Sequence, residues 1–210
     1  IGYLRNFWTL YSSIKYLNIK AGLLTLYPQQ IESFPHLLFL NISQNFLISI
    51  CSLHGAASVF HTLILTQVLD ASDNLLNRLS KSCFKGLESL KYLHLRNNTI
   101  QEIQTGTFLG LGKILLLDLS FNKISFLENY CFLGIVHLSY LDLKGNEIKT
   151  MESEVFSDIT ILQLGSPSYK VCCLYKKRDI ICPVTRHWMS SCDDLLSDKA
   201  MRGVIWVTAF

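Results

Sequence analysis

Several motifs that would assign a chemical activity are missing from this chain of 210 residues. It has no GxSxG motif, no phosphate-binding glycine loop and no nucleophile with a base at a usable spacing, and its six histidines are dispersed. No run of five like charges occurs and the net charge is only +3, which gives little support to a nucleic-acid-binding tail or a polybasic membrane patch. We therefore predict that the chain is not an enzyme, needs no cofactor and binds no nucleic acid.

A leader peptide and a complete membrane span are also missing. Ile1 opens the chain without an initiating Met, a charged segment or a cleavage site, so we expect a fragment of a longer protein. The terminal apolar stretch 203–210 is far shorter than the roughly 20 residues that span a bilayer. It could form only the first half of a transmembrane helix.

What the chain does contain is a repeat. Segments that begin at Leu90, Ile114 and Leu138 share the pattern LxxLxLxxNxI followed by Phe-x-x-Leu or Phe-x-x-Ile, and the pattern continues upstream with decay to about seven copies over 1–164. This pattern is typical of leucine-rich repeats. It predicts an α/β solenoid with short parallel strands on the concave face, an irregular or helical convex side, and a disulfide-stapled C-terminal cap.

The letters of the repeat have a physical meaning. The leucines of LxL should point inward from a short strand, and the phenylalanine should close the same core from the convex side. The recurring asparagine (Asn98, Asn122, Asn146) should also point inward, where its amide bonds backbone groups that the turning chain leaves unpaired. Thr66 and Ala71 stand where leucines are expected, and the stretch 48–65 is either a loop or a modified repeat.

Three scattered cysteines give no metal site. Cys51 with His54 and His61 does not have the spacing of a zinc site and lacks a fourth ligand, so we predict no metal. Cys83 and Cys131 each precede a repeat phenylalanine, and we expect both to act as small buried hydrophobes.

The tail contains the other four cysteines, Cys172, Cys173, Cys182 and Cys192. Four cysteines permit three pairings, and a bond between the adjacent Cys172 and Cys173 would be strained. These two should therefore bond to Cys182 and Cys192, in one order or the other. We expect 165–193 to form a cysteine-rich cap or hinge.

The tail also carries a family resemblance. "CDDLLSDKAMRGVIWV" from Cys192 and "LQLGSPSYKVCC" resemble the hinge and first-helix junction of leucine-rich-repeat-containing G-protein-coupled receptors, which include the glycoprotein-hormone and relaxin receptors. The short hinge is more similar to relaxin receptors and their invertebrate relatives, whereas Cys192 is similar to the glycoprotein-hormone pattern.

That resemblance implies a ligand-binding ectodomain at the plasma membrane, with 194–210 as the juxtamembrane segment and the start of transmembrane helix 1. The implied partners are a peptide hormone, a heterotrimeric G protein acting through the missing transmembrane part, and the membrane beyond residue 200. The alternative is a secreted or single-span leucine-rich-repeat adhesion protein.

The register of the repeats predicts which residues a ligand would contact. Side chains that flank the inward leucines should project from the concave face, with Asp118 and Asp142 as an adjacent acidic pair. Tyr92, His94 and Tyr140 should lie beside them. Such a surface suits a basic peptide with an apolar anchor, as relaxin-like hormones are in the family.

Two N-glycosylation sequons start at Asn41 and Asn97, in agreement with a secreted or ectodomain setting. Asn41 is predicted to lie on the concave face. A glycan there would keep a protein ligand off the N-terminal strands and direct it to repeats four to six.

Overall fold

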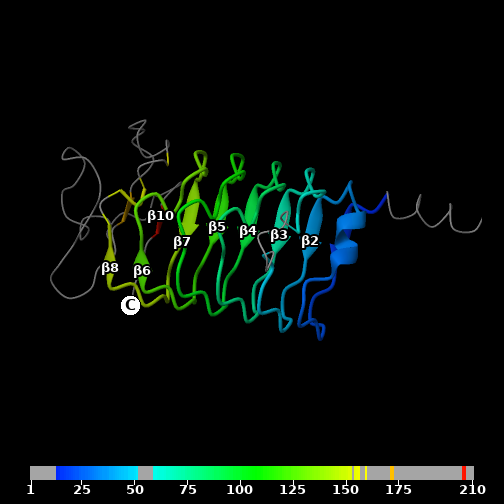
Figure 1. Ribbon diagram of the computed structural model, residues 1–210, viewed down its shortest axis with the longest axis horizontal. Coiled ribbons are helices and arrows are strands. Elements are labelled where there is room, and N and C mark those ends of the chain that lie inside the picture. Colours follow the sequence, from blue (N-terminus) through cyan, green and yellow to red (C-terminus); the bar gives the residue numbers. More distant parts are fainter. Residues whose placement is uncertain are drawn as a thin grey trace, which may run out of the picture.

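The computed structural model describes residues 13–51, 59–152, 154–156 and 159, together with two short strands at 171–172 and 205–206. Its main feature is a sheet of six parallel strands, each contributed by one repeat. Figure 1 shows β2, β3, β4, β5 and β7 of this sheet side by side. In sheet order the strands are β1 (Tyr16–Asn18), β2 (Phe39–Asn41), β3 (Val68–Asp70), β4 (Tyr92–His94), β5 (Leu116–Asp118) and β7 (Tyr140–Asp142). The predicted leucine-rich-repeat solenoid with short parallel strands is confirmed.

Each strand of three residues turns its middle side chain into the core. Leu40, Leu69, Leu93, Leu117 and Leu141 are fully buried, while the residues on either side of them stay partly or largely exposed. This alternation is the normal consequence of β geometry, in which successive side chains point to opposite faces. It fixes which side chains reach the concave surface.

The repeat asparagines form the predicted internal ladder. Asn98 Nδ2 donates to the carbonyls of Leu95 at 3.0 Å and of Ala71, in the preceding repeat, at 3.1 Å. Its Oδ1 accepts from the backbone N–H of Leu76 at 3.0 Å. Asn45, Asn74, Asn122 and Asn146 repeat this pattern, so the buried amides tie each of these turns of the solenoid to the one before it.

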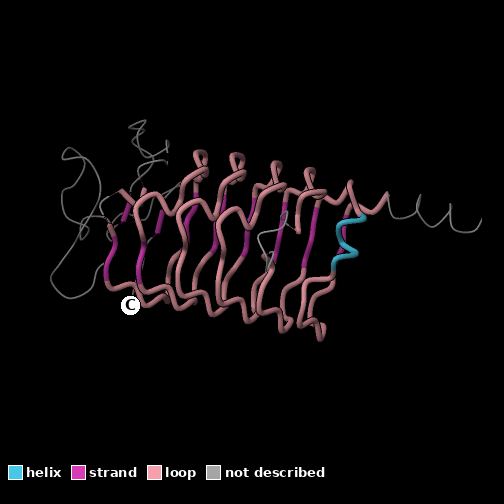
Figure 2. Tube along the Cα trace, viewed as in Figure 1, coloured by secondary structure: helices cyan, strands magenta, loops and turns pink. Residues whose placement is uncertain are grey.

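The convex side is irregular in the described residues, with one short 3₁₀ helix, η1 (Gln29–Ser33), and a small parallel pair formed by β6 (Phe126–Leu127) and β8 (Thr150–Met151). Loops make up most of this side in Figure 2. Its core is a stack of phenylalanine rings whose neighbouring centroids are 5.6–6.1 Å apart: Phe60, Phe84, Phe108, Phe132 and Phe156.

The repeat between β2 and β3 is longer than the next one, and its residues 52–58 lie outside the described part of the chain. Val68 of β3 pairs with Phe39, 29 positions earlier, whereas Tyr92 of β4 pairs with Val68, 24 positions earlier. The longer repeat nevertheless places Phe60 in the ring stack. Thr66, at a leucine position, is fully buried and donates its hydroxyl to the Leu37 carbonyl at 2.9 Å, which satisfies the polar group inside the core.

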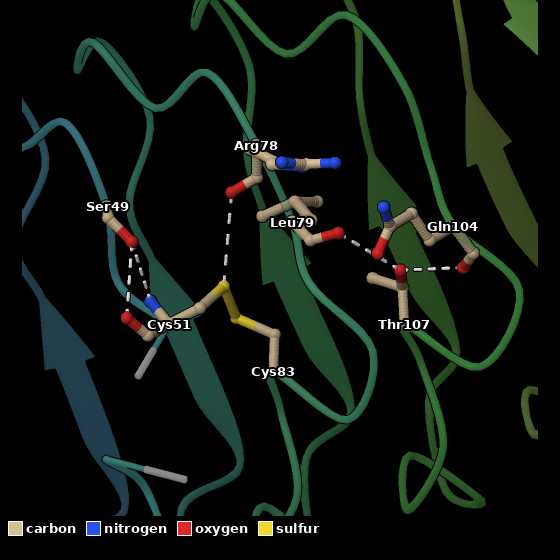
Figure 3. The surroundings of a disulfide bond; sticks show 7 residues. All are labelled: Ser49, Cys51, Arg78, Leu79, Cys83, Gln104 and Thr107. Carbon is tan, nitrogen blue, oxygen red and sulfur yellow. Dashed lines mark hydrogen bonds between the residues drawn. A yellow bond between two sulfur atoms is a disulfide. The ribbon is translucent and has the colours of Figure 1, made fainter. Parts of the chain in front are cut away.

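A disulfide joins Cys51 to Cys83, and Figure 3 shows its surroundings. The prediction that Cys83 is merely a small buried hydrophobe is therefore wrong. The longer repeat brings Cys51 to within 4.9 Å (Cα to Cα) of Cys83, on the convex loop of the next repeat. Cys131, at the equivalent position one repeat beyond Thr107, is buried and free, as predicted.

The tail is described only at β9 (Val171–Cys172) and β10 (Ile205–Trp206), which pair in parallel. The predicted disulfides of Cys172, Cys173, Cys182 and Cys192 lie outside the described side chains, as do most of the predicted cap 165–193 and juxtamembrane segment 194–210. Among the described residues, no helix has the length and apolar character needed to cross a membrane.

Candidate ligand-binding face

The parallel register brings the predicted acidic residues together. Asp118 of β5 pairs with Asp142 of β7 on one side and with His94 of β4 on the other. Asp70 of β3 pairs with His94 in turn. We call Asp70, Asp118 and Asp142 the carboxylate row. Asp118 and Asp142 are one strand spacing apart, about 4.8 Å, and Asp70 is two spacings from Asp118, with His94 between them.

Part of this acidic pattern serves the backbone. Asp118 Oδ1 accepts from the N–H of Ser120 at 2.9 Å and from its hydroxyl at 2.6 Å. Asp142 Oδ1 accepts from the N–H of Lys144 at 2.8 Å. These bonds are side-chain turns of the kind that asparagine and aspartate form two residues along, which explains why the repeat favours them at the end of each strand. The second carboxylate oxygen is not needed for the turn.

The carboxylate row changes the chemistry of Tyr140. Its hydroxyl donates to Asp142 Oδ2 at 3.3 Å. Burial, followed by the nearby carboxylates of Asp142 and Asp118, raises the pKa of Tyr140 above its ordinary value. The phenol is thus a hydrogen-bond donor beside two carboxylates.

An apolar row runs beside the carboxylates, formed by the first residues of successive strands: Phe39, Val68, Tyr92, Leu116 and Tyr140. The structure places Tyr92 and Tyr140 on either side of Leu116, so these two predicted contacts share one face but are not adjacent. Of this row Tyr92 is 39% exposed, and the other four side chains are partly exposed. The face thus combines accessible apolar area with negative charge.

Sequence reasoning missed a cation–aromatic pair at the edge of this face. The Arg96 guanidinium lies 4.2 Å from the ring centroid of Phe121, and Arg96 Nη1 donates to Ser120 Oγ at 3.1 Å. Phe121 has a left-handed backbone conformation (φ 54°) and is 40% exposed. The signal that could have found it is the repeat alignment, in which Asn97 and Gly145 occupy the same position.

The two sequon asparagines lie on or beside the same surface. Asn41 ends β2 in the row that contains Asp70, and its Oδ1 accepts from the Ser43 N–H at 2.9 Å and hydroxyl at 2.7 Å. Asn97 is exposed, and its Nδ2 donates to Asp73 Oδ1 at 2.8 Å, toward the N-terminal neighbour. Glycosylation at either asparagine stays a prediction.

The described part of the chain contains no group of three histidine, cysteine or acidic side chains that could hold a metal ion. His54, one member of the trio considered from sequence, lies outside the described residues. Of its other members, Cys51 is bonded to Cys83, and His61 Nδ1 lies 3.9 Å from Glu32 Oε2.

The family model described as "Leucine rich repeat" matches residues 54–100, 65–124, 88–148 and 116–164, which together cover more than half of the chain. No curated protein has a sequence that matches significantly.

Three solved structures share the fold. The leucine-rich repeat protein LIC12759 of Leptospira interrogans is 24% identical with a TM-score of 0.61, over 76% of this chain and 43% of its own. The leucine-rich repeat domain of APL1B is 20% identical with a TM-score of 0.57, over 70% and 40%. TLR13, in a complex with ssRNA13, is 30% identical with a TM-score of 0.56, over 62% and 18%. This chain therefore spans less than half the length of each.

Proposed function

This chain belongs to the leucine-rich repeat family, whose domains bind protein and other ligand partners, and from that premise we propose that it is the ligand-binding ectodomain of a G-protein-coupled receptor for a relaxin-like peptide hormone. The hormone would bind the concave face. The observation that carries the proposal is the pairing of Asp118 with Asp142 beside the partly exposed apolar row.

Charge and shape support a basic peptide. Two adjacent carboxylates, each with one oxygen not needed for its turn, attract arginine or lysine. Tyr92, Leu116 and Tyr140 offer the partly desolvated apolar contact on which interface affinity usually depends. The same row of negative charge would repel a phosphate backbone, so we do not extend the RNA ligand of TLR13 to this face.

We propose that the chain lies outside the cell, at the plasma membrane. Disulfides persist mainly in oxidising compartments, and Cys51 is bonded to Cys83. The sequons at Asn41 and Asn97 agree with such a setting. A glycan on Asn41 would leave β4, β5 and β7 as the open part of the concave face.

Signalling would need the part of the receptor that follows residue 200. Hormone binding would favour one arrangement of solenoid and hinge, and the hinge would pass that preference to the transmembrane bundle and its heterotrimeric G protein. The alternative, a secreted or single-span adhesion protein, uses the same solenoid with no bundle. Sequencing the transcript beyond Phe210 separates them, because seven apolar spans support the receptor and one or none supports the adhesion protein.

A binding experiment tests the proposal on the face itself. The affinity of a fluorescent relaxin-family peptide is measured for the wild type, for Asp118→Lys with Asp142→Lys, and for Glu128→Lys as a matched reversal on an exposed convex residue. We expect the concave double reversal to weaken binding at least about tenfold, which corresponds to about 1.4 kcal/mol, and the convex reversal to leave it within about twofold. Equal effects of the two reversals would contradict the concave-face proposal.

A further inference from the structure

Arg96 is an exposed cation in an ordered position. The two ion pairs within the described residues are Arg78 with Glu102 and His61 with Glu32, so Arg96 has no carboxylate partner there. Its guanidinium is nevertheless held at two points, by the Phe121 ring at 4.2 Å and by Ser120 Oγ at 3.1 Å. An arginine fixed in this way loses little conformational freedom when it binds an acidic group.

The same contacts connect Arg96 to the carboxylate row. The buried Ser120 hydroxyl donates to Asp118 Oδ1 at 2.6 Å while it accepts from Arg96 Nη1. The hydroxyl therefore orients both charged groups at once. Since Arg96 uses one N–H for this bond, the other donors of its planar fork stay available to a ligand.

Phe121 is an unusual choice for its position. Equivalent residues of the other repeats also have positive φ, and they are Ala21, Gln44, Asp73, Asn97 and Gly145. A large side chain in this conformation is strained, and such strain is retained mainly where surrounding structure or function requires it. A Cβ added at Gly145 would lie 2.8 Å from Phe121 Cδ1, so the ring also depends on a glycine in the next repeat. The fold itself would be served by asparagine, as at Asn97.

We propose that Arg96, positioned by Phe121 and Ser120, binds a carboxylate of the polypeptide partner, either an acidic side chain or the C-terminus. This inference rests on the proposed function, because it assumes that the partner occupies the concave face. The partner is then recognised by two opposite charges, a basic group at Asp118 and Asp142 and an acidic group at Arg96, with Ser120 Oγ bonded to both Arg96 Nη1 and Asp118 Oδ1 between them. Arginine and aromatic side chains are also the residue types that most often dominate interface affinity.

The test uses peptides selected against the wild-type chain from a display library of disulfide-constrained peptides. Each selected peptide is resynthesised with one acidic side chain changed to its amide, or with the C-terminus amidated, which separates the two sources of carboxylate. Affinities are measured for the wild type, Arg96→Gln, Arg96→Lys, Phe121→Asn and, as a matched arginine control in an ion pair elsewhere, Arg78→Gln.

We expect Arg96→Gln to weaken binding at least about tenfold and Arg78→Gln to leave it within about twofold. Arg96→Lys and Phe121→Asn should each weaken it about three- to tenfold, because the planar fork or its platform is lost while the fold is kept. For each peptide, one of the carboxylate replacements should lower its affinity for the wild type, and the same replacement should not change its affinity for Arg96→Gln.

The inference is overturned if every carboxylate replacement has the same effect on the wild type and on Arg96→Gln, or if Arg96→Gln binds normally. Measuring the same peptides on the double variant Asp118→Asn with Asp142→Asn distinguishes failure of this inference from failure of the proposed function. Peptides that depend on these two aspartates but not on Arg96 contradict only the role proposed for Arg96. Peptides that depend on neither contradict both.

Discussion

The bond between Cys51 and Cys83 should be a major contribution to the stability of the solenoid. It closes a loop across a sequence separation of 32 residues. Loop-closure entropy for that length gives about 3.7 kcal/mol at 25 °C, a large fraction of the roughly 5–15 kcal/mol by which proteins of this kind are stable. We therefore predict that Cys51→Ala with Cys83→Ala lowers the free energy of unfolding by about 3–4 kcal/mol beyond the loss of the two sulfur atoms.

Urea unfolding at pH 7 without reductant measures this contribution. Cys131→Ala is the control, because it removes one buried sulfur that forms no disulfide, at a cost of about 1 kcal/mol. Twice that loss is subtracted from the loss in the double variant. A remainder below about 1 kcal/mol would refute the reasoning, since closing a loop of this length should remove more entropy than that from the unfolded chain.

Three further predictions concern the ladder, the thiols and the tyrosine. Asn122→Ala should lower the free energy of unfolding by about 3 kcal/mol, because the Ile100 N–H and three carbonyls lose their buried partner. The neighbouring exposed Lys123→Ala should change it by less than about 0.5 kcal/mol in the same urea titration, and equal losses would contradict the ladder. Burial raises the pKa of the Cys131 thiol, so a thiol reagent at pH 8 should modify no cysteine in the native chain. After denaturation without reductant it should modify one cysteine, whereas five modified cysteines would show that the tail cysteines are unpaired. Because the pKa of Tyr140 is raised in the folded chain, Tyr140 of the unfolded chain loses its proton first above about pH 10, and the free energy of unfolding falls there. In alkaline unfolding curves the wild type should therefore lose stability more steeply than Tyr140→Phe. Parallel curves would contradict the raised pKa of Tyr140.

The fold was predictable because the repeat fixes its own register. With Asn98 and Asn122 at a constant spacing, each strand must pair with the strand of the next repeat, and the concave positions follow from the alternation of side chains. For the same reason, the contact between Asp118 and Asp142 could be predicted from residue numbers alone.

The bond between Cys51 and Cys83 and the contact of Arg96 with Phe121 could not be predicted in this way. Cys51 lies in the one longer repeat, where the spacing gives no register, so its distance from Cys83 depended on the path of the convex chain. The contact between Arg96 and Phe121 depends on side-chain rotamers and on the choice of phenylalanine at a left-handed position that the repeats share, and the pattern LxxLxLxxN encodes neither. Both features arise where one repeat departs from its neighbours.

Carbodiimide labelling of carboxylates, read by mass spectrometry with and without a bound relaxin-family peptide, tests the central claim most directly. Asp118 and Asp142 should be labelled in the free chain through the oxygen that the strand-end turn does not use. When the peptide is bound, we predict that labelling of both falls at least about fivefold while labelling of the convex Glu128 is unchanged, because a bound partner excludes reagent only from the face that it covers. Unchanged labelling of Asp118 and Asp142 in a saturated complex would contradict recognition by the concave face.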